Sequence, residues 1–506
     1  MSRTTLLVLL IVSAMTTSLF PGVVPAQDHA HPSGAPDRLG TVHFATSCAP
    51  AVQPQFDRAV ALLHSFEFGA SIRAFNEVLA TDSTCAMAHW GIAISRWTNP
   101  MAAGNRTAAQ LRDGRIAVER AERLTARATE RERGYIRAIA TLYDSAHANQ
   151  RAQLVAYERA MDAHRMSFPA DTEATIFYAL ALAAAAPPTD KTYANQLKAG
   201  ALLEPLWAKQ PNHPGLAHYI IHSYDYTPLA DKARAAARRY AGIAPTAAHA
   251  LHMPSHTFTR VGMWQESINT NTCSMQVALS TGSIAEALHA ADYAVYANLQ
   301  LGRHTAAKAI LDSLPSLRAR FDPNAVTGAA PGSAGLFALA TIPARYALER
   351  GAWAEAAKLE PRATNYPYTE AMTYFARSLG AARSRDVVRA KTDVDSLASI
   401  QRRLASQGEP FWAEQVAIQL LGAQAWIDLA EGRRDAALSG MREAAKREDA
   451  TEKNAVTPGP LAPARELLGD MLLQLGRTSD ARIEYRATLT KEPNRRRALR
   501  GADARR

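Results

Sequence analysis

Apolar residues recur at helical spacing along most of this chain, and single glycines interrupt the pattern. Each of these glycines follows one apolar-periodic stretch and precedes another, and a small residue stands five positions later. A glycine can take the left-handed conformation that ends a helix, and a small residue lets two helices approach closely. The pattern predicts helical hairpins at six places: Gly69 with Ala74, Gly262 with Ser267, Gly302 with Ala307, Gly351 with Ala356, Gly432 with Ala437 and Gly476 with Ala481.

The last of these units resembles the tetratricopeptide repeat, a helix-turn-helix unit of about 34 residues. The match is best from Leu468 to Pro493, although Thr488 stands where the family usually has alanine. The resemblance implies an all-α fold, a solenoid of helical hairpins in which the first helix of each repeat lines a concave groove. The stretch from His252 to Trp264 also resembles exported bacterial proteins of this family, a likeness that implies no particular activity.

The two ends of the chain and one internal segment do not follow the repeat pattern. The apolar run from Leu6 to Ala14 is too short to cross a membrane, and small residues follow it at Val24 and Ala26, as in a secretory signal peptide. We therefore expect an exported protein, periplasmic or extracellular, without a transmembrane segment. The expected organisation is a signal peptide (1–26), a flexible leader (27–45), an N-terminal repeat region with a His-rich groove (46–321), a linker (322–335), C-terminal repeats (336–497) and a basic tail (498–506).

Cysteine content and charge refine this expectation. Three cysteines in an exported chain favour one disulfide, and Cys48 and Cys85 are the expected pair because both flank the first helical unit, which leaves Cys273 free. The net charge of +10 is spread along the chain and ends in a basic segment that begins at Arg495. We interpret that segment as a solvated tail and expect no nucleic-acid partner.

Histidines are concentrated in one part of the chain. Six of the fifteen lie between His213 and His256. Histidine is the commonest metal ligand in proteins. By the tetratricopeptide resemblance, three successive first helices present to one groove the sets His218 with His222, His249 with His252 and His256, and His289 with Asp292 and Tyr296.

Two interpretations of this set remain open. Residues four apart share a helix face, and packed helices lie about 8–10 Å apart, so imidazoles from neighbouring helices can reach one ion. The ion would be a divalent transition metal, namely zinc, iron, manganese or copper, with Asp225 orienting a ligand. Alternatively, the groove binds a peptide through the polar and aromatic side chains beside the histidines, which are Tyr219, Asp225, Tyr226, Arg260 and Tyr296.

One residue complicates the register. Pro254 removes a backbone donor from the helix expected there, and the alternative is a helix that begins near Pro254 and leaves His249 and His252 on the preceding turn. The sequence contains no phosphate-binding glycine loop, no H-E-x-x-H and no G-x-S-x-G, so the question of enzymatic activity stays open. We expect an exported repeat protein whose concave groove binds a protein or peptide. The alternative is a metal-binding protein or metalloenzyme that uses the cluster from His218 to Asp292.

Overall fold

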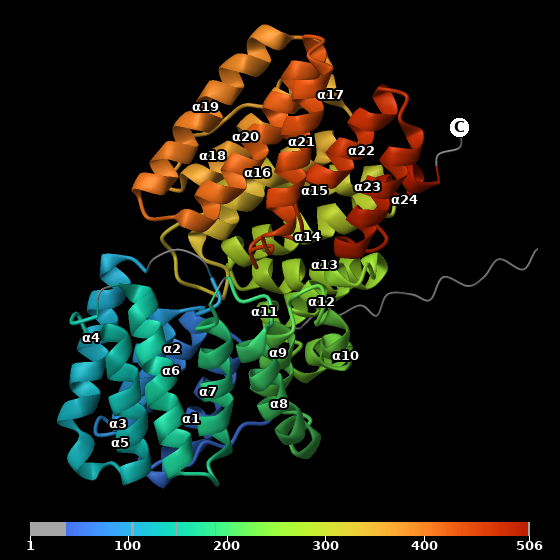
Figure 1. Cartoon of the computed structure of the whole chain (residues 1–506). Helices are drawn as coiled ribbons and strands as arrows, with labels where there is room; N and C mark the ends of the chain where they lie inside the picture. The colour runs from blue at the N-terminus through green and yellow to red at the C-terminus, as the bar shows by residue number, and fades with distance from the viewer. Residues whose placement is uncertain (1–36, 103–105, 148, 188, 504–506) are drawn as a thin grey trace, which may run out of the picture. The chain divides into compact units, whose positions relative to one another are not determined.

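Helices are the only regular secondary structure in the described residues of this computed structural model, which are 37–102, 106–147, 149–187 and 189–503 (Figure 1). The predicted all-α class is therefore confirmed. None of the helices in these ranges is long and apolar enough to cross a membrane. The expected signal peptide and the start of the leader lie outside the described residues.

The first nine helices follow one another as packed neighbours. Helix α1 packs on α2, α2 on α3 and α3 on α4, and the same succession runs from α5 to α9. Residues 106–147 and 149–166 are mainly helical. The bounds are α1 (Gln53–His64), α2 (Phe68–Thr81), α3 (Ala86–Trp97), α4 (Ala108–Arg123), α5 (Glu130–Ala140), α6 (Gln150–Ser167), α7 (Thr172–Ala184), α8 (Ala194–Lys209) and α9 (Pro214–Ser223).

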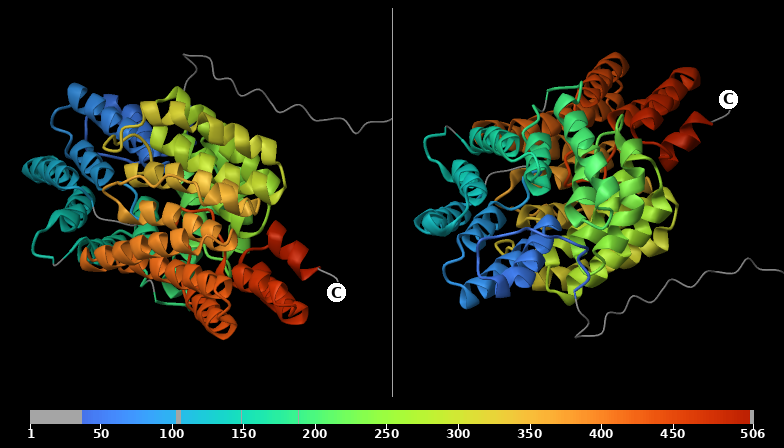
Figure 2. Two further views of the ribbon diagram at one scale, coloured as in Figure 1. Left: turned by 90° about the horizontal axis from the view of Figure 1, so that it is seen from above. Right: turned by 90° about the horizontal axis from the view of Figure 1, so that it is seen from below.

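The later helices continue the succession, with α13 packed on α14, α14 on α16, α18 on α19 and α20 on α21. In Figure 2 the chain can be followed by colour from its N-terminal to its C-terminal helices. The bounds are α10 (Arg234–Ile243), α11 (Ala248–His252), α12 (Pro254–Arg260), α13 (Trp264–Ser280), α14 (Ile284–Gln300), α15 (His304–Arg320), α16 (Gly332–Glu349), α17 (Trp353–Ala356), α18 (Pro367–Arg383), α19 (Val387–Ser406), α20 (Pro410–Ala430), α21 (Arg434–Asp449), α22 (Ala464–Gln474), α23 (Thr478–Lys491) and α24 (Arg496–Ala502).

Five of the six predicted glycine turns have left-handed backbone geometry, at Gly262, Gly302, Gly351, Gly432 and Gly476. The small residue five positions after each of them is fully buried where two helices meet. The prediction at Gly69 is wrong, because Gly69 lies inside α2 and Phe66 takes the left-handed turn with φ of 57°. Gly69 is instead a point of close approach, since a Cβ there would lie 2.6 Å from the carbonyl oxygen of Val326.

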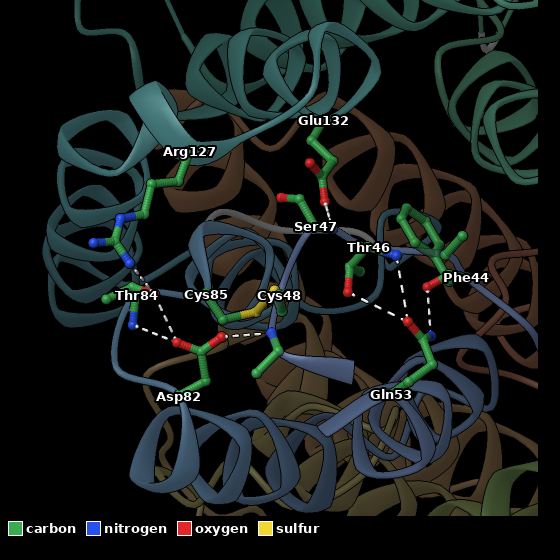
Figure 3. Close-up of a disulfide and its surroundings, with 12 residues drawn as sticks. Phe44, Thr46, Ser47, Cys48, Gln53, Asp82, Thr84, Cys85, Arg127 and Glu132 are labelled. Atoms are coloured by element: carbon green, nitrogen blue, oxygen red, sulfur yellow. Dashed lines mark hydrogen bonds between the residues drawn. A yellow bond between two sulfur atoms is a disulfide. The ribbon is translucent and has the colours of Figure 1, made fainter. Parts of the chain in front are cut away.

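The end of the expected flexible leader (27–45) is packed on the first helices. Phe44 is fully buried, and its ring lies 5.1–5.7 Å from the rings of Phe56, Trp90 and Tyr135. Cys48 and Cys85 then form the predicted disulfide, with Cα atoms 4.9 Å apart (Figure 3). Apolar contacts and this covalent link together hold the entering segment against the first helices.

The expected linker and basic tail are also packed. Helix α16 begins inside the expected linker, and the preceding Ala329 and Ala330 are buried. Residues 37–506 form one compact unit, so segment 322–335 does not separate two domains. At the other end, Arg495 is only 1% exposed and its Nε donates to Glu466 over 2.8 Å. The basic segment is therefore not simply a solvated tail, because a buried guanidinium is stable only when it is paired.

Candidate metal centre

The six histidines of the predicted set meet in the interior of the protein, where α9, α11, α12 and α14 come together. Pro214 starts α9, which carries two of them, and Pro254 starts α12 after a break at Met253. Short α11 carries the pair that the sequence left on a preceding turn. The structure therefore differs from the expected open groove, because all six side chains are at most 6% exposed: His218, His222, His249, His252, His256 and His289.

These side chains form two compact groups, which we call the first and second triads. The first triad is His218, His222 and His249, and the second is His252, His256 and His289. Each residue of a triad offers one ring nitrogen that lies within 4.8 Å of those of the other two. Each triad combines residues from two or more helices, so the fold and not local sequence brings the nitrogens together.

Four of the rings are fixed through Nδ1, which leaves Nε2 directed toward the other histidines. Nδ1 of His218 bonds the carbonyl oxygen of His64 over 2.6 Å, and Nδ1 of His249 bonds Glu286 over 3.0 Å. Nδ1 of His252 bonds the amide oxygen of Asn271 over 2.7 Å, and Nδ1 of His256 bonds Asp225 over 2.8 Å. Metal-binding histidines are oriented by outer partners of this kind.

The Nε2 atoms of His252 and His256 lie 3.0 Å apart. The Asn271 amide nitrogen donates to the carbonyl oxygen of Ser267, so its oxygen must accept from His252. An ionised Asp225 can only accept, so His256 must also donate through Nδ1. When both rings are neutral, each Nε2 then carries a lone pair, and the two lone pairs repel each other. A cation bound between the two nitrogens removes this repulsion. Two nitrogens on one tetrahedral zinc ion would lie about 3.3 Å apart.

Four other ring nitrogens of the two triads have no hydrogen-bonding partner within the described part of the chain. They are Nε2 of His218, His222 and His249 and Nδ1 of His289, all buried. Buried polar atoms in folded proteins are nearly always hydrogen-bonded, so each of these atoms requires an explanation. Both triads therefore combine firmly held rings with lone pairs that the protein does not satisfy.

The electrostatics keep the rings in the form that binds metals. Burial lowers the pKa of four of the histidines well below its ordinary value, and neighbouring histidines lower it further: His218, His222, His252 and His289. Although burial opposes ionisation of Asp225, Lys453 and Arg260 hold the pKa of that carboxyl well below its ordinary value. Neutral imidazoles beside an ionised carboxylate are the protonation states that a metal site requires.

Asp292, predicted as a further ligand, lies outside both triads. Its Oδ1 accepts from Nε of Arg345 over 3.1 Å, and Arg345 is fully buried on α16. The carboxylate faces this guanidinium because a buried positive charge needs a counter-charge.

The five predicted neighbours of the histidines have different surroundings. Nε of Arg260 donates to Asp225 over 2.9 Å, so both belong to the second triad's surroundings. The Tyr219 hydroxyl bonds His64 over 3.0 Å. The Tyr226 ring packs on Tyr193. The Tyr296 hydroxyl accepts from Nη1 of Arg495 over 3.1 Å. These contacts of the last three residues lie outside the triads, although the Tyr219 ring is also 5.2 Å from that of His218.

A third histidine group was not predicted. Glu173 accepts from Nε2 of His64 over 3.0 Å and from Nε2 of His213 over 2.9 Å. His64 and Glu173 lie outside the His-rich segment, and neither belongs to a sequence motif that would identify it as part of a site. Because the carboxylate already pairs with a nitrogen of each ring, we interpret this group as a buried ion-pair network. Asn271, Glu286 and Lys453 were missed for the same reason, since only tertiary packing places them beside the triads.

The comparisons with known proteins assign no family. The sequence matches no protein-family model and no curated protein. Among solved structures, the human IFIT1 dimer with m7Gppp-AAAA is 13% identical with a TM-score of 0.36, over 83% of this chain and 90% of that chain. Yeast Tom70 is 11% identical with a TM-score of 0.34, over 89% of this chain and 94% of that chain. With scores this low, neither likeness bears on what this chain binds.

Proposed function

We propose that this protein binds transition-metal ions in its interior, one in each histidine triad. The 3.0 Å approach of the His252 and His256 Nε2 atoms carries the proposal, because both rings already donate through Nδ1. Histidines that serve packing alone commonly satisfy their ring nitrogens with protein groups or ordered water. The fixed rings and unsatisfied nitrogens of the first triad support a second ion there.

The donor set favours zinc or copper among the four metals considered. Both triads offer imidazole nitrogens alone, whereas manganese prefers oxygen ligands and non-haem iron commonly has a carboxylate. Three protein ligands leave one position of a tetrahedral ion open to an exogenous ligand, as in catalytic zinc sites. The centre is therefore suited to bind and polarise a small ligand, and an export route would load it outside the cytoplasm.

Elemental analysis of the full mature chain tests this proposal. The purified protein is stripped of metal, titrated with zinc or copper and desalted. We expect two ions per chain, and one ion each in His222→Ala and His289→Ala, which alter different triads. His43→Ala is the matched control, because that ring is largely exposed and its loss should leave two ions. Metal-free protein after titration, or the same metal content in all three variants, would overturn the proposal.

Peptide or protein binding is the second candidate function, and a different part of the molecule favours it. A cavity of about 860 Å³ lies between α15, α16 and the segment that follows α17. Its walls combine apolar side chains with two arginines, and the proximity of Arg362 adds to the burial that lowers the pKa of Arg318. An acidic peptide with apolar side chains would relieve that repulsion. The main apolar residues are Leu311, Leu314, Phe321, Leu336, Leu339 and Leu359.

A labelled peptide of alternating glutamate and leucine tests this candidate by fluorescence anisotropy. Arg362→Glu should weaken binding, whereas Arg402→Glu, a charge reversal on α19 away from the cavity, should not. Equal binding by both variants would exclude the cavity as the peptide site. Metal content should be the same in both variants, so the two candidate functions are tested separately.

A further inference from the structure

The two triads adjoin each other. Across the boundary between them, the ring centroids of His222 and His256 lie 6.3 Å apart and those of His249 and His252 lie 6.0 Å apart. Within the triads, neighbouring centroids lie between 4.4 Å (His252 and His289) and 6.3 Å (His222 and His249). The nearest rings of different triads are thus about as far apart as the most distant rings of one triad, so two bound ions would be neighbours.

One small cavity touches both triads. It has a volume of about 40 Å³, and its walls include His222 and His249 of the first triad and His256 and His289 of the second. A cavity needs roughly 10–15 Å³ for each water molecule, so this one holds a ligand of two or three heavy atoms. The other walls carry Ala330 and further apolar side chains together with Asn99, Ser333 and Asn454.

Charge determines which small ligand suits the cavity. Six neutral imidazoles add no charge, so two divalent ions would bring four positive charges into the interior. The carboxylates that bond rings of the triads are Asp225 and Glu286, and Asp225 is already paired with Arg260 and with Lys453 at 3.5 Å. The excess positive charge favours an anion at the open coordination positions, because an unbalanced buried charge is costly.

We propose that the two triads form one dinuclear centre in which a single small anion, hydroxide at rest, bridges both ions. This inference rests on the proposed function and goes beyond it by joining the two sites. The bridging anion completes the coordination of both ions and offsets part of their charge. Metal binding lowers the pKa of water, and two ions sharing one water lower it further, which makes hydroxide the resting ligand at neutral pH.

Copper and azide are the probes for the test. The metal-free full chain is loaded with Cu(II), its copper content is measured, and its electron paramagnetic resonance signal is integrated. A bridging hydroxide couples the two unpaired electrons, so we expect two copper ions per chain with almost no signal. Azide should then replace hydroxide at one molecule per pair of ions and give a new charge-transfer absorption. His222→Ala should keep one copper ion and show the full signal of that single ion.

Ala330→Leu fills the cavity without changing a ligand and serves as the second variant. It should keep both copper ions but lose azide binding, whereas Ala307→Leu, a buried substitution between α14 and α15, should leave azide binding unchanged in folded protein. Two copper ions with two full signals, or two independent azide sites, would overturn the dinuclear centre while the proposed metal binding stands. A chain that binds neither copper nor zinc would overturn both.

Discussion

His252 and His256 face each other through Nε2 at 3.0 Å while each donates from Nδ1 to a fixed acceptor. The two rings lie one helical turn apart in sequence, but they belong to α11 and α12, which Pro254 separates. The break therefore lies between two members of the second triad, and the division between the triads falls within α11, which carries His249 of the first and His252 of the second. Pro254 thus disrupts the expected register, while the two rings on either side of it still meet in one triad.

Asn271 should control metal affinity at the second triad without touching the ion. Its amide oxygen fixes the His252 ring, so Asn271→Ala should weaken binding of one ion by about 10- to 100-fold, the range for loss of an outer partner. Titration with zinc and a competing chelator measures this change. Asn298→Ala is the matched control, because Asn298 makes the same bond to a carbonyl four residues earlier on α14. Equal affinities in both variants would contradict the role assigned to Asn271.

The metal-free protein should lose stability as the pH falls below the ordinary histidine value of about 6.5. Folding lowers the pKa of His218, His222, His252 and His289, so the unfolded chain binds more protons below that pH. Each histidine then removes up to about 1.4 kcal/mol of unfolding free energy per pH unit.

Buried carboxyls oppose this effect, chiefly the two whose pKa rises to near neutrality. Burial raises the pKa of Glu67 to about 8 and that of Glu448 to about 7, so each stabilises the folded state as the pH falls. Four histidines outweigh two carboxyls, and urea unfolding of metal-free protein at several pH values should show a net loss toward acid. Bound metal should shift this loss to lower pH, because it keeps the rings deprotonated. A metal-free protein that gains stability between about pH 6.5 and about pH 5 would contradict the assigned shifts.

Asp292 should matter for stability and not for metal content. Asp292→Asn removes the counter-charge of buried Arg345 and should lower the unfolding free energy by about 3–5 kcal/mol. Elemental analysis should still find two ions per chain. Asp312→Asn on α15 is the control, because its pair with Lys308 is exposed and should contribute less than about 1 kcal/mol. Loss of one ion in Asp292→Asn would restore that residue as a ligand.

Features set by local geometry could be predicted from the sequence, and features set by long-range packing could not. Five glycine turns follow from the backbone freedom of glycine and from apolar residues on both sides. The concentration of histidines was visible, but their burial was not, because residues 329–334 and 454–456 cover them from elsewhere in the chain. Asp292 was misassigned for the same reason, since Arg345 lies 53 residues away.

Cys48 and Cys85 should stabilise the fold without contributing to the metal centre. Their disulfide closes a loop across 37 positions, and cross-links of this kind contribute about 2–4 kcal/mol, mainly by restricting the unfolded chain. Cys48→Ser/Cys85→Ser should lower the unfolding free energy by that amount, as should a reducing agent added to the unaltered protein. Cys273→Ser is the control, because that thiol is free and only partly buried.

A reducing agent should have no further effect on the double variant, since no disulfide remains to be broken. Two ions should still bind per chain, because the histidine rings are held by Asn271, Glu286, Asp225 and the His64 carbonyl and not by the disulfide. A double variant that stays folded but loses metal would show that the entering segment positions the triads. Unchanged unfolding free energy would instead mean that the apolar contacts of Phe44 hold this segment without the covalent link.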